Sequence, residues 1–279
     1  MSRAHPSDVS AVRVRLDVAY DGTDFHGWAV QPGLRTVAGE LTGALARLLG
    51  PEGSAGLTVA GRTDAGVHAT GQVCHVDVAA PAWERMGSTL LRRLAGVLPP
   101  DVRVTAVTPV TGEFDARFSA LARHYHYRVG DAPYGVDPLR RRDTVAWPRP
   151  LDLAALAASA VGLVGEHDFA AFCRRKDDGT TIRTVTRLDW GRDPDGVLVA
   201  TVSADAFCQA MVRSLVGAML AVGEGRQPPQ WPASLLELRE RSGDVKVAPP
   251  HGLALVAVDY PDIPAEWAAR AAQTRRRRS

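Results

Sequence analysis

The chain has 279 residues, of which 46% are hydrophobic and 23% are charged, with a formal net charge of +2. This balance is typical of a globular protein with one large domain or two modest ones. No apolar run reaches the roughly 18 residues of a membrane span, and residues 1–10 lack the apolar segment of a secretory signal. We therefore expect a cytoplasmic protein with no membrane association.

The first half of the chain predicts the order strand, helix, strand, strand, helix, strand. Alternation of apolar and polar residues indicates strands, and longer segments that stop at glycine or proline indicate helices. The expected elements are strands over Val12–Tyr20, Leu57–Thr63, Gly71–Ala79 and Val102–Val110, with helices over Thr36–Leu49 and Trp83–Val97.

The second half predicts the same order of elements. Its expected strands are His124–Val129, Thr186–Trp190, Val197–Ala204 and Leu253–Tyr260, and its expected helices are Leu151–Val164 and Phe207–Val222. Each half matches the split βαβ, or ferredoxin-like, pattern. We therefore predict an α+β fold of two ferredoxin-like units, residues 11–112 and 113–262. Their antiparallel sheets would join side by side, with helices packed on one face, a central cleft, and peripheral tails over 1–10 and 263–279.

One octapeptide, Gly61-Arg62-Thr63-Asp64-Ala65-Gly66-Val67-His68, follows an apolar strand. Its glycines allow a sharp turn that presents Asp64, with Arg62 close enough to keep the carboxylate ionised. A held carboxylate can act as a nucleophile or as a base. A polar hairpin tip is the simpler interpretation, but it leaves Arg62, Thr63 and His68 unexplained.

The expected helix that begins at Phe207 carries a single charge, Arg213, within the apolar, small or neutral residues 206–223. A helix that is apolar all round is buried, and a buried arginine needs an anionic partner. Arg213 could instead reach the surface from the helix edge. We favour a pair between Arg213 and Asp64, because this helix offers no other cation.

Alternation along residues 123–127 places Tyr125 and Tyr127 on one face of a strand. Both tyrosines could belong to the core, and we expect this of Tyr127. A tyrosine in a cleft could instead stack on a base or move a proton, while Arg117 and Arg123 could hold phosphates. Periodicity alone leaves both interpretations of Tyr125 open.

Arginine greatly outnumbers lysine, and its planar guanidinium suits bidentate contacts to phosphate. Three clusters lie within residues 117–142, 174–187 and 275–278. These clusters fit a phosphate-rich partner, although genomic base composition would favour arginine as well. The three cysteines, at positions 74, 173 and 208, match neither a disulfide framework nor zinc-ligand spacing, so we predict structural thiols.

Several of these segments together resemble the tRNA pseudouridine synthase A family, in the same order along the chain. The resemblance spans about Val12–Tyr260 and is carried by the octapeptide, Tyr20-Asp21-Gly22, Gly27-Trp28, Ala116-Arg117-Phe118-Ser119, Tyr125 and Met211-Val212-Arg213. It implies an isomerase that converts uridine to pseudouridine at positions 38, 39 and 40 in the anticodon stem-loop of tRNA. It also implies a homodimer, an RNA-binding central cleft, and neither a metal nor an organic cofactor.

The same resemblance implies roles for individual residues. Asp64 would be the catalytic carboxylate, which attacks either the ribose or the uracil ring. Tyr125 would contact the target base and accept the proton from its C5 atom. Arg213 would pair with Asp64, and Arg62 would help to splay the nucleotide out of its stack.

Two other functions compete with this interpretation. A metal-assisted hydrolase could use Asp64, His68 and His75, although these residues do not share a helical face. A catalytically silent RNA-binding module would explain the arginines and aromatic residues. It would not explain a carboxylate among cations that face RNA.

Overall fold

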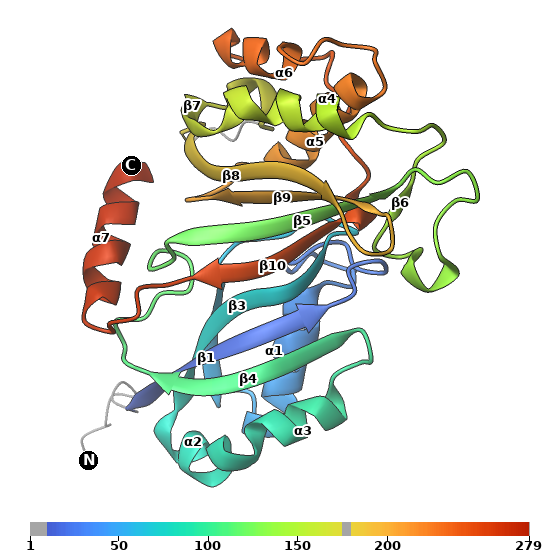
Figure 1. The fold of residues 1–279 in the computed structure, drawn as a ribbon. Helices are drawn as coiled ribbons and strands as arrows, with labels where there is room; N and C mark the ends of the chain where they lie inside the picture. The colour runs from blue at the N-terminus through green and yellow to red at the C-terminus, as the bar shows by residue number, and fades with distance from the viewer. Residues whose placement is uncertain (1–9, 175–179, 279) are drawn as a thin grey trace, which may run out of the picture.

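The computed structural model describes residues 10–174 and 180–278 of the chain (Figure 1). The expected tail over residues 1–9 and part of the second arginine cluster, residues 175–178, lie outside the described residues. Within the described ranges, no helix combines the length and the apolar character needed to cross a membrane.

The elements predicted for the first half are present, and one of them is divided. The bounds are β1 Ala11–Tyr20, α1 Val37–Leu49, β2 Ser54–Val59, β3 His68–Ala79, α2 Ala80–Met86, α3 Leu90–Val97 and β4 Val102–Val110. Thr36 caps α1, because its side chain accepts a hydrogen bond from the Gly39 amide. The expected helix over Trp83–Val97 is broken by a 3₁₀ turn over Gly87–Thr89, where Gly87 lies against the Trp83 ring.

The second half contains the predicted elements and several short ones in addition. The bounds are β5 Ala122–Gly130, β6 Val145–Ala146, α4 Leu153–Ala160, β7 Gly165–Asp168, β8 Ile182–Arg192, β9 Leu198–Ala204, α5 Met211–Gly223, α6 Trp231–Ser234, β10 Leu253–Asp259 and α7 Glu266–Arg278. Elements of two to four residues, such as β6, β7 and α6, are too short to show a periodic pattern of hydrophobic residues, so the sequence does not predict them.

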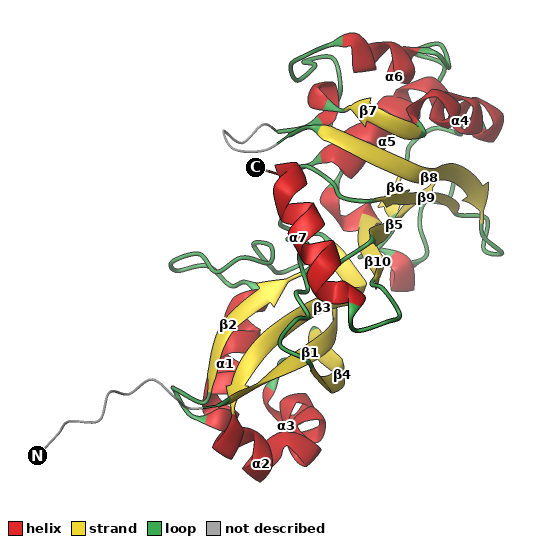
Figure 2. Cartoon of the chain, turned by 90° about the vertical axis from the view of Figure 1, so that its left-hand side faces the viewer, coloured by secondary structure: helices red, strands yellow, loops and turns green. Residues whose placement is uncertain are grey.

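The strands form one ten-stranded sheet in a mixed α+β fold with helices packed on one side (Figures 1 and 2). The order is β4-β1-β3-β10-β5-β9-β8-β7, with β2 beside β3 and β6 beside β5. The first half therefore reads β4-β1-β3-β2, and the second half reads β10-β5-β9-β8. Corresponding strands of the two halves occupy corresponding places.

The two halves meet where β3 pairs with β10 in parallel. His68 lies opposite Ala254, and Ala69 lies opposite Leu255. A Cβ atom added to Gly71 would come within 2.1 Å of the Val256 carbonyl oxygen, so only glycine allows this approach. Because β3 begins at His68, the octapeptide enters the sheet at the join between the halves.

The segment expected to be a C-terminal tail contains helix α7, which packs on the connection between β4 and β5. The Trp267 ring lies 5.0 Å from the Phe114 ring, and its Nε1 donates to the Pro261 carbonyl oxygen. The helix stands at the left of the sheet in Figure 1 and faces the viewer in Figure 2. Its inward stripe of Trp267, Ala271 and Thr274 is too narrow to stand out in an arginine-rich sequence.

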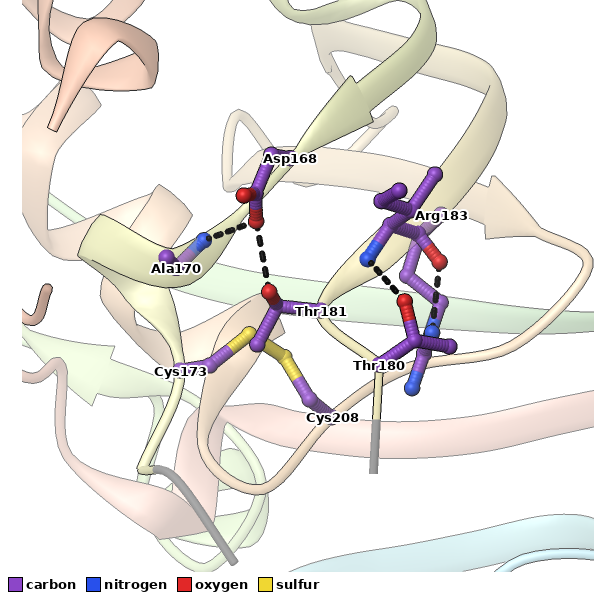
Figure 3. The surroundings of a disulfide bond; sticks show 8 residues. Asp168, Ala170, Cys173, Thr180, Thr181, Arg183 and Cys208 are labelled. Carbon is purple, nitrogen blue, oxygen red and sulfur yellow. Dashed lines mark hydrogen bonds between the residues drawn. A yellow bond between two sulfur atoms is a disulfide. The ribbon is translucent and has the colours of Figure 1, made fainter. Parts of the chain in front are cut away.

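The prediction that all three cysteines are thiols is wrong for two of them. Cys173 and Cys208 form a disulfide, with their Cα atoms 5.6 Å apart, whereas Cys74 is a buried free thiol (Figure 3). The partners are 35 residues apart in the sequence. Their pairing depends on the β7–β8 and β9–α5 connections meeting at one place, which cysteine spacing does not reveal.

Helix α5 is buried along nearly its whole length, as its apolar sequence predicts. At Gly217 its backbone lies against the chain beside it, since an added Cβ atom would come within 1.8 Å of the Lys246 carbonyl oxygen. This close approach fixes the distance between α5, which carries Arg213, and the segment around Lys246.

We expect Gly217→Ala to lower the free energy of unfolding by about 1–3 kcal/mol or more, because the methyl group forces α5 away from Lys246. Gly43→Ala in α1 is the matched control, since nothing lies within 4 Å of its added Cβ atom. The control should be neutral or stabilise the fold by up to about 1 kcal/mol. Urea unfolding of both variants measures the difference, and equal stabilities would contradict this packing.

Candidate active site

The Asp64 loop is braced by a buried hydrogen-bond network beneath it. The Tyr20 hydroxyl lies 2.8 Å from the Thr63 hydroxyl. Gln72, which is fully buried, donates from Nε2 to the Gly61 carbonyl oxygen at 2.9 Å and to the Tyr20 hydroxyl at 3.2 Å. Buried side chains with satisfied hydrogen bonds hold one geometry, so the loop has a fixed platform on β1 and β3.

The loop after β1 braces the octapeptide from its other side. The Trp28 amide donates to the Thr63 carbonyl oxygen, and the Gly66 amide donates to the Phe25 carbonyl oxygen. Gly27 has φ +93, and a Cβ atom there would lie 2.9 Å from the Thr63 oxygen, so glycine is required. Trp28 is only 3% exposed and belongs to the core.

Asp64 faces Arg213, as the apolar helix predicts. Arg213 Nη1 lies 3.4 Å from Asp64 Oδ2, and Arg213 Nε donates to the Ala248 carbonyl oxygen at 2.8 Å. The carbonyl fixes the guanidinium, which therefore presents its remaining donors toward the carboxylate. Both side chains are partly exposed, at 31% for Asp64 and 18% for Arg213.

Arg62 does not make the predicted contact with Asp64. Within the described residues, the ion-pair partner of Asp64 is Arg213, and the Arg62 side chain is exposed on the wall of a cleft. Proximity in sequence is therefore a poor guide to the partner of this carboxylate.

Tyr125 lies on β5 and is 7% exposed, with its ring packed edge-on against Phe207 at 5.2 Å between centroids. Burial raises the pKa of the Tyr125 phenol to about 12, and the nearby Asp64 charge acts in the same direction, against Arg123. The phenol is therefore protonated at neutral pH. Tyr127 is fully buried and donates to the Pro249 carbonyl oxygen, which confirms its place in the core.

Arg123 and Arg117 differ in their surroundings. Arg123 is 4% exposed, and its guanidinium donates to the carbonyl oxygens of Ala60, Arg117 and Asp205 at 2.7 to 2.9 Å. Burial lowers the pKa of Arg123. Its donors are committed to the backbone, so the geometry favours a structural role. Arg117 is exposed and lies over the Phe118 ring at 5.0 Å.

A cleft of about 1400 Å³ brings the candidate residues of both halves together. From the first half its wall includes Arg62 and Asp64, and from the second half Arg117, Arg123, Tyr125 and Arg213. Arg275 of α7 reaches the same wall, where it pairs with Asp115 at 2.9 Å and lies over Phe118 at 4.8 Å. The carboxylate and the buried phenol are thus accompanied by four exposed guanidinium groups, those of Arg62, Arg117, Arg174 and Arg275.

The trio considered for metal binding is not assembled. His68 Nδ1 accepts from the Gly22 amide at 2.9 Å, and His75 Nδ1 accepts from the Ala116 amide at 3.0 Å. The two imidazoles therefore fix backbone at different places, while Asp64 faces Arg213. Among the described residues, no three His, Cys, Asp or Glu side chains are grouped as metal ligands.

Sequence reasoning missed the residues that support the site. Gln72 acts through its side-chain amide on β3, and Ala248 acts through its main-chain carbonyl. Neither residue belongs to a recognisable sequence motif. The sequence predicts a helix from Phe207, whereas α5 begins at Met211 after Ala210, whose φ of 63 marks a break. A polar residue such as Gln72 amid the apolar positions of a strand is the one signal that the sequence offers.

Comparison with known proteins identifies the class. A family model described as tRNA pseudouridine synthase matches residues 159–261. A protein of Frankia casuarinae named tRNA pseudouridine synthase A is 61% identical over 264 residues, which cover 95% of this chain and 94% of that relative. These matches place the chain among the pseudouridine synthases, which are isomerases.

Two further relatives narrow the assignment. Proteins named tRNA pseudouridine synthase A from Streptomyces griseus and Mycobacterium leprae are 56% and 50% identical, over 265 and 287 residues. The first alignment covers 95% of this chain and 93% of the relative, and the second covers 98% of each. The chain belongs to the tRNA pseudouridine synthase A family.

The raised pKa of Tyr125 makes stability depend on pH in the alkaline range. The folded state favours the neutral phenol, so this contribution is complete below pH 10 and is lost as the pH rises to about 12. Between pH 8 and pH 11.5, the unfolding free energy of Tyr125→Phe should fall by about 2 kcal/mol less than that of the parent. Urea unfolding at both pH values measures this, with the exposed Tyr134→Phe as control. Identical pH dependence of Tyr125→Phe and the parent would refute it.

Proposed function

We propose that this chain isomerises uridine to pseudouridine at positions 38, 39 and 40 in the anticodon stem-loop of tRNA. The observation that carries the proposal is the Asp64–Arg213 pair, set beside the buried Tyr125 phenol in one cleft. The names of the relatives supply tRNA as the substrate class. A cleft wall with four exposed guanidinium groups suits a polyanion of this kind.

The reaction breaks the bond between uracil N1 and ribose C1′ and forms a bond between uracil C5 and C1′. C5 loses a proton and N1 gains one, so the product is an isomer of the substrate. In our proposal Asp64 is the nucleophile, and Arg213 keeps its carboxylate oriented. The base is detached and rotated within the cleft, so no external group is consumed. Attack on the ribose and attack on the uracil ring both use the same carboxylate.

Tyr125 contacts the base and takes part in removal of the C5 proton. Its phenol carries a proton at neutral pH, because burial holds its pKa well above 7. It can accept the C5 proton only if its own proton leaves in the same step, to solvent in the open cleft that Tyr125 lines. Phe207 packs edge-on against the ring and fixes its orientation for this transfer.

The exposed arginines of the cleft wall would bind the RNA backbone. Arg62 and Arg117 on opposite halves, with Arg275 on α7, are placed to contact phosphates around an extruded nucleotide. Arg123 is excluded from this set, because its donors are bound to main-chain oxygens.

We also propose the architecture and the assembly that the sequence predicts. Residues 11–112 and 113–262 would be two ferredoxin-like units, which the matching strand orders of the halves support. The enzyme would act as a cytoplasmic homodimer without metal or organic cofactor.

Asp64→Asn tests the proposed chemistry, because it keeps the shape of the side chain and removes the nucleophile. With unmodified tRNA that carries tritium at uridine C5, we expect tritium release to fall at least about 10³-fold. Asp195→Asn, in the exposed turn between β8 and β9, should release tritium like the parent. Tritium release that disappears with a strong chelator would instead favour a metal-assisted enzyme. If the parent binds tRNA but releases no tritium, the result would favour a catalytically silent RNA-binding module.

Truncation after Thr274 tests the contribution of α7, since it removes Arg275 but keeps Trp267 in the core. We expect the tRNA dissociation constant to rise about two- to tenfold at physiological salt. The slope of log K against log salt should become shallower by about one for each phosphate that α7 no longer neutralises. A double substitution of Arg92 and Arg93 by alanine, on α3 outside the cleft, is the control. An unchanged slope in the truncated protein would refute this role.

A further inference from the structure

The Cys173–Cys208 disulfide ties the cleft wall to a rigid part of the second half (Figure 3). Cys208 is partly exposed on the wall of the cleft, and Cys173 is 1% exposed in the core beneath it. Cys208 follows Phe207, which packs on Tyr125, and precedes α5, which carries Arg213. The bond therefore ends within five residues of two side chains that line the active site.

The Cys173 end of the bond is firmly held. The Asp168 carboxylate accepts hydrogen bonds from the Ala170 amide and the Thr181 hydroxyl (Figure 3). Phe169 and Phe172 are fully buried on either side of this turn. Cys173 is thus an immobile anchor for its partner.

The Cys208 end depends on the bond to a greater degree. Ala210 has φ 63, a left-handed conformation that alanine adopts only where its surroundings impose it. Besides the disulfide, the Gln209 carbonyl accepts from the Arg174 amide, and the Met211 amide donates to the Cys208 carbonyl oxygen. Asp205, before this segment, stays held by Thr184 and Arg123 without the bond. The Ala210 carbonyl oxygen accepts from the Ser214 amide, so the covalent tie matters most for residues 206–209.

We propose that Cys173 and Cys208 form a reversible thiol–disulfide site that tunes the active site, with the oxidised form the more active. The proposal concerns the same cleft and rests on the proposed function for its effect on turnover. In the oxidised form the bond holds the segment 206–209, and through Phe207 it holds the Tyr125 ring against which Phe207 packs. In the reduced form this segment gains freedom, and fewer molecules hold the productive geometry at any time.

A low-molecular-weight disulfide is the oxidant that this geometry admits. The Cys208 thiolate, which faces the cleft, attacks one sulfur of the small disulfide and releases one small thiol. The Cys173 thiolate then attacks Cys208 in the mixed disulfide and releases the second small thiol. The two protein protons end on the two released thiols. A small dithiol reverses the sequence by attacking the accessible Cys208 sulfur and leaves with its own two sulfurs joined.

Cys74 supplies an internal control for this chemistry. It is fully buried on β3, and burial raises the pKa of its thiol well above the ordinary value. A thiol that is neither exposed nor ionised does not exchange. It should remain reduced in every condition that interconverts the other two.

The test equilibrates the full chain in glutathione buffers of graded potential and measures three quantities. We expect one titratable thiol after denaturation of the oxidised protein and three after denaturation of the reduced protein. Hydrogen exchange of the peptide that spans residues 205–213 should become at least about fivefold faster on reduction. The kcat/KM for pseudouridine formation should fall about three- to tenfold.

Variants separate this site from general effects of redox buffers. Cys208→Ser and Cys173→Ala should each keep two thiols at every potential and match the reduced parent in hydrogen exchange and in kcat/KM. Cys74→Ala should respond to the potential in these two readouts like the parent. Three thiols at every potential would overturn the site. A change in thiol number without a change in hydrogen exchange and in kcat/KM would overturn its control of the cleft. If no tRNA is isomerised in any state, the proposed function fails, while thiol number and hydrogen exchange still decide whether the bond governs the segment.

Discussion

The parallel pairing of β3 with β10 is the constraint on which the active site depends. Two residue pairs, at His68 and Ala69, join the strands of the two halves at the centre of the sheet. Because β3 begins where the octapeptide ends, the join places Asp64 next to elements from the second half. The close approach at Gly71 sets the spacing, and a larger residue would separate the strands.

Around this join, Asp64 and Arg213 are each held in position by residues that take no part in the proposed reaction. The Asp64 loop rests on Tyr20 and Gln72, and the Arg213 guanidinium is fixed by the Ala248 carbonyl. Both the carboxylate and the guanidinium are therefore already oriented toward each other before a substrate binds. Such preorganisation is what a reaction needs when it breaks and remakes a bond to one carbon within a cleft.

The sequence predicted most of the helices and strands, and it predicted the Asp64–Arg213 pair, because a lone arginine in an apolar helix needs an anion. It did not predict which arginine near Tyr125 is available to a ligand. Periodicity assigns Arg123 to a face of β5, but three carbonyl oxygens from distant segments determine its burial. The disulfide was missed for the same reason, since its cysteines meet only through tertiary structure. Helix α7 was missed because its inward stripe is hidden among arginines.

Arg123 has a consequence for how the chain acquires its structure. Its guanidinium belongs to the second half, yet one of its acceptors is the carbonyl oxygen of Ala60, immediately before the octapeptide in the first half. In a second half without its partner, that donor would face water instead of a fixed acceptor. Docking of the first half supplies the acceptor, so the β5 region and the Asp64 loop are joined by a hydrogen bond that neither half makes alone. A first half taken from a distant relative must therefore reproduce the position of the Ala60 carbonyl to keep this bond.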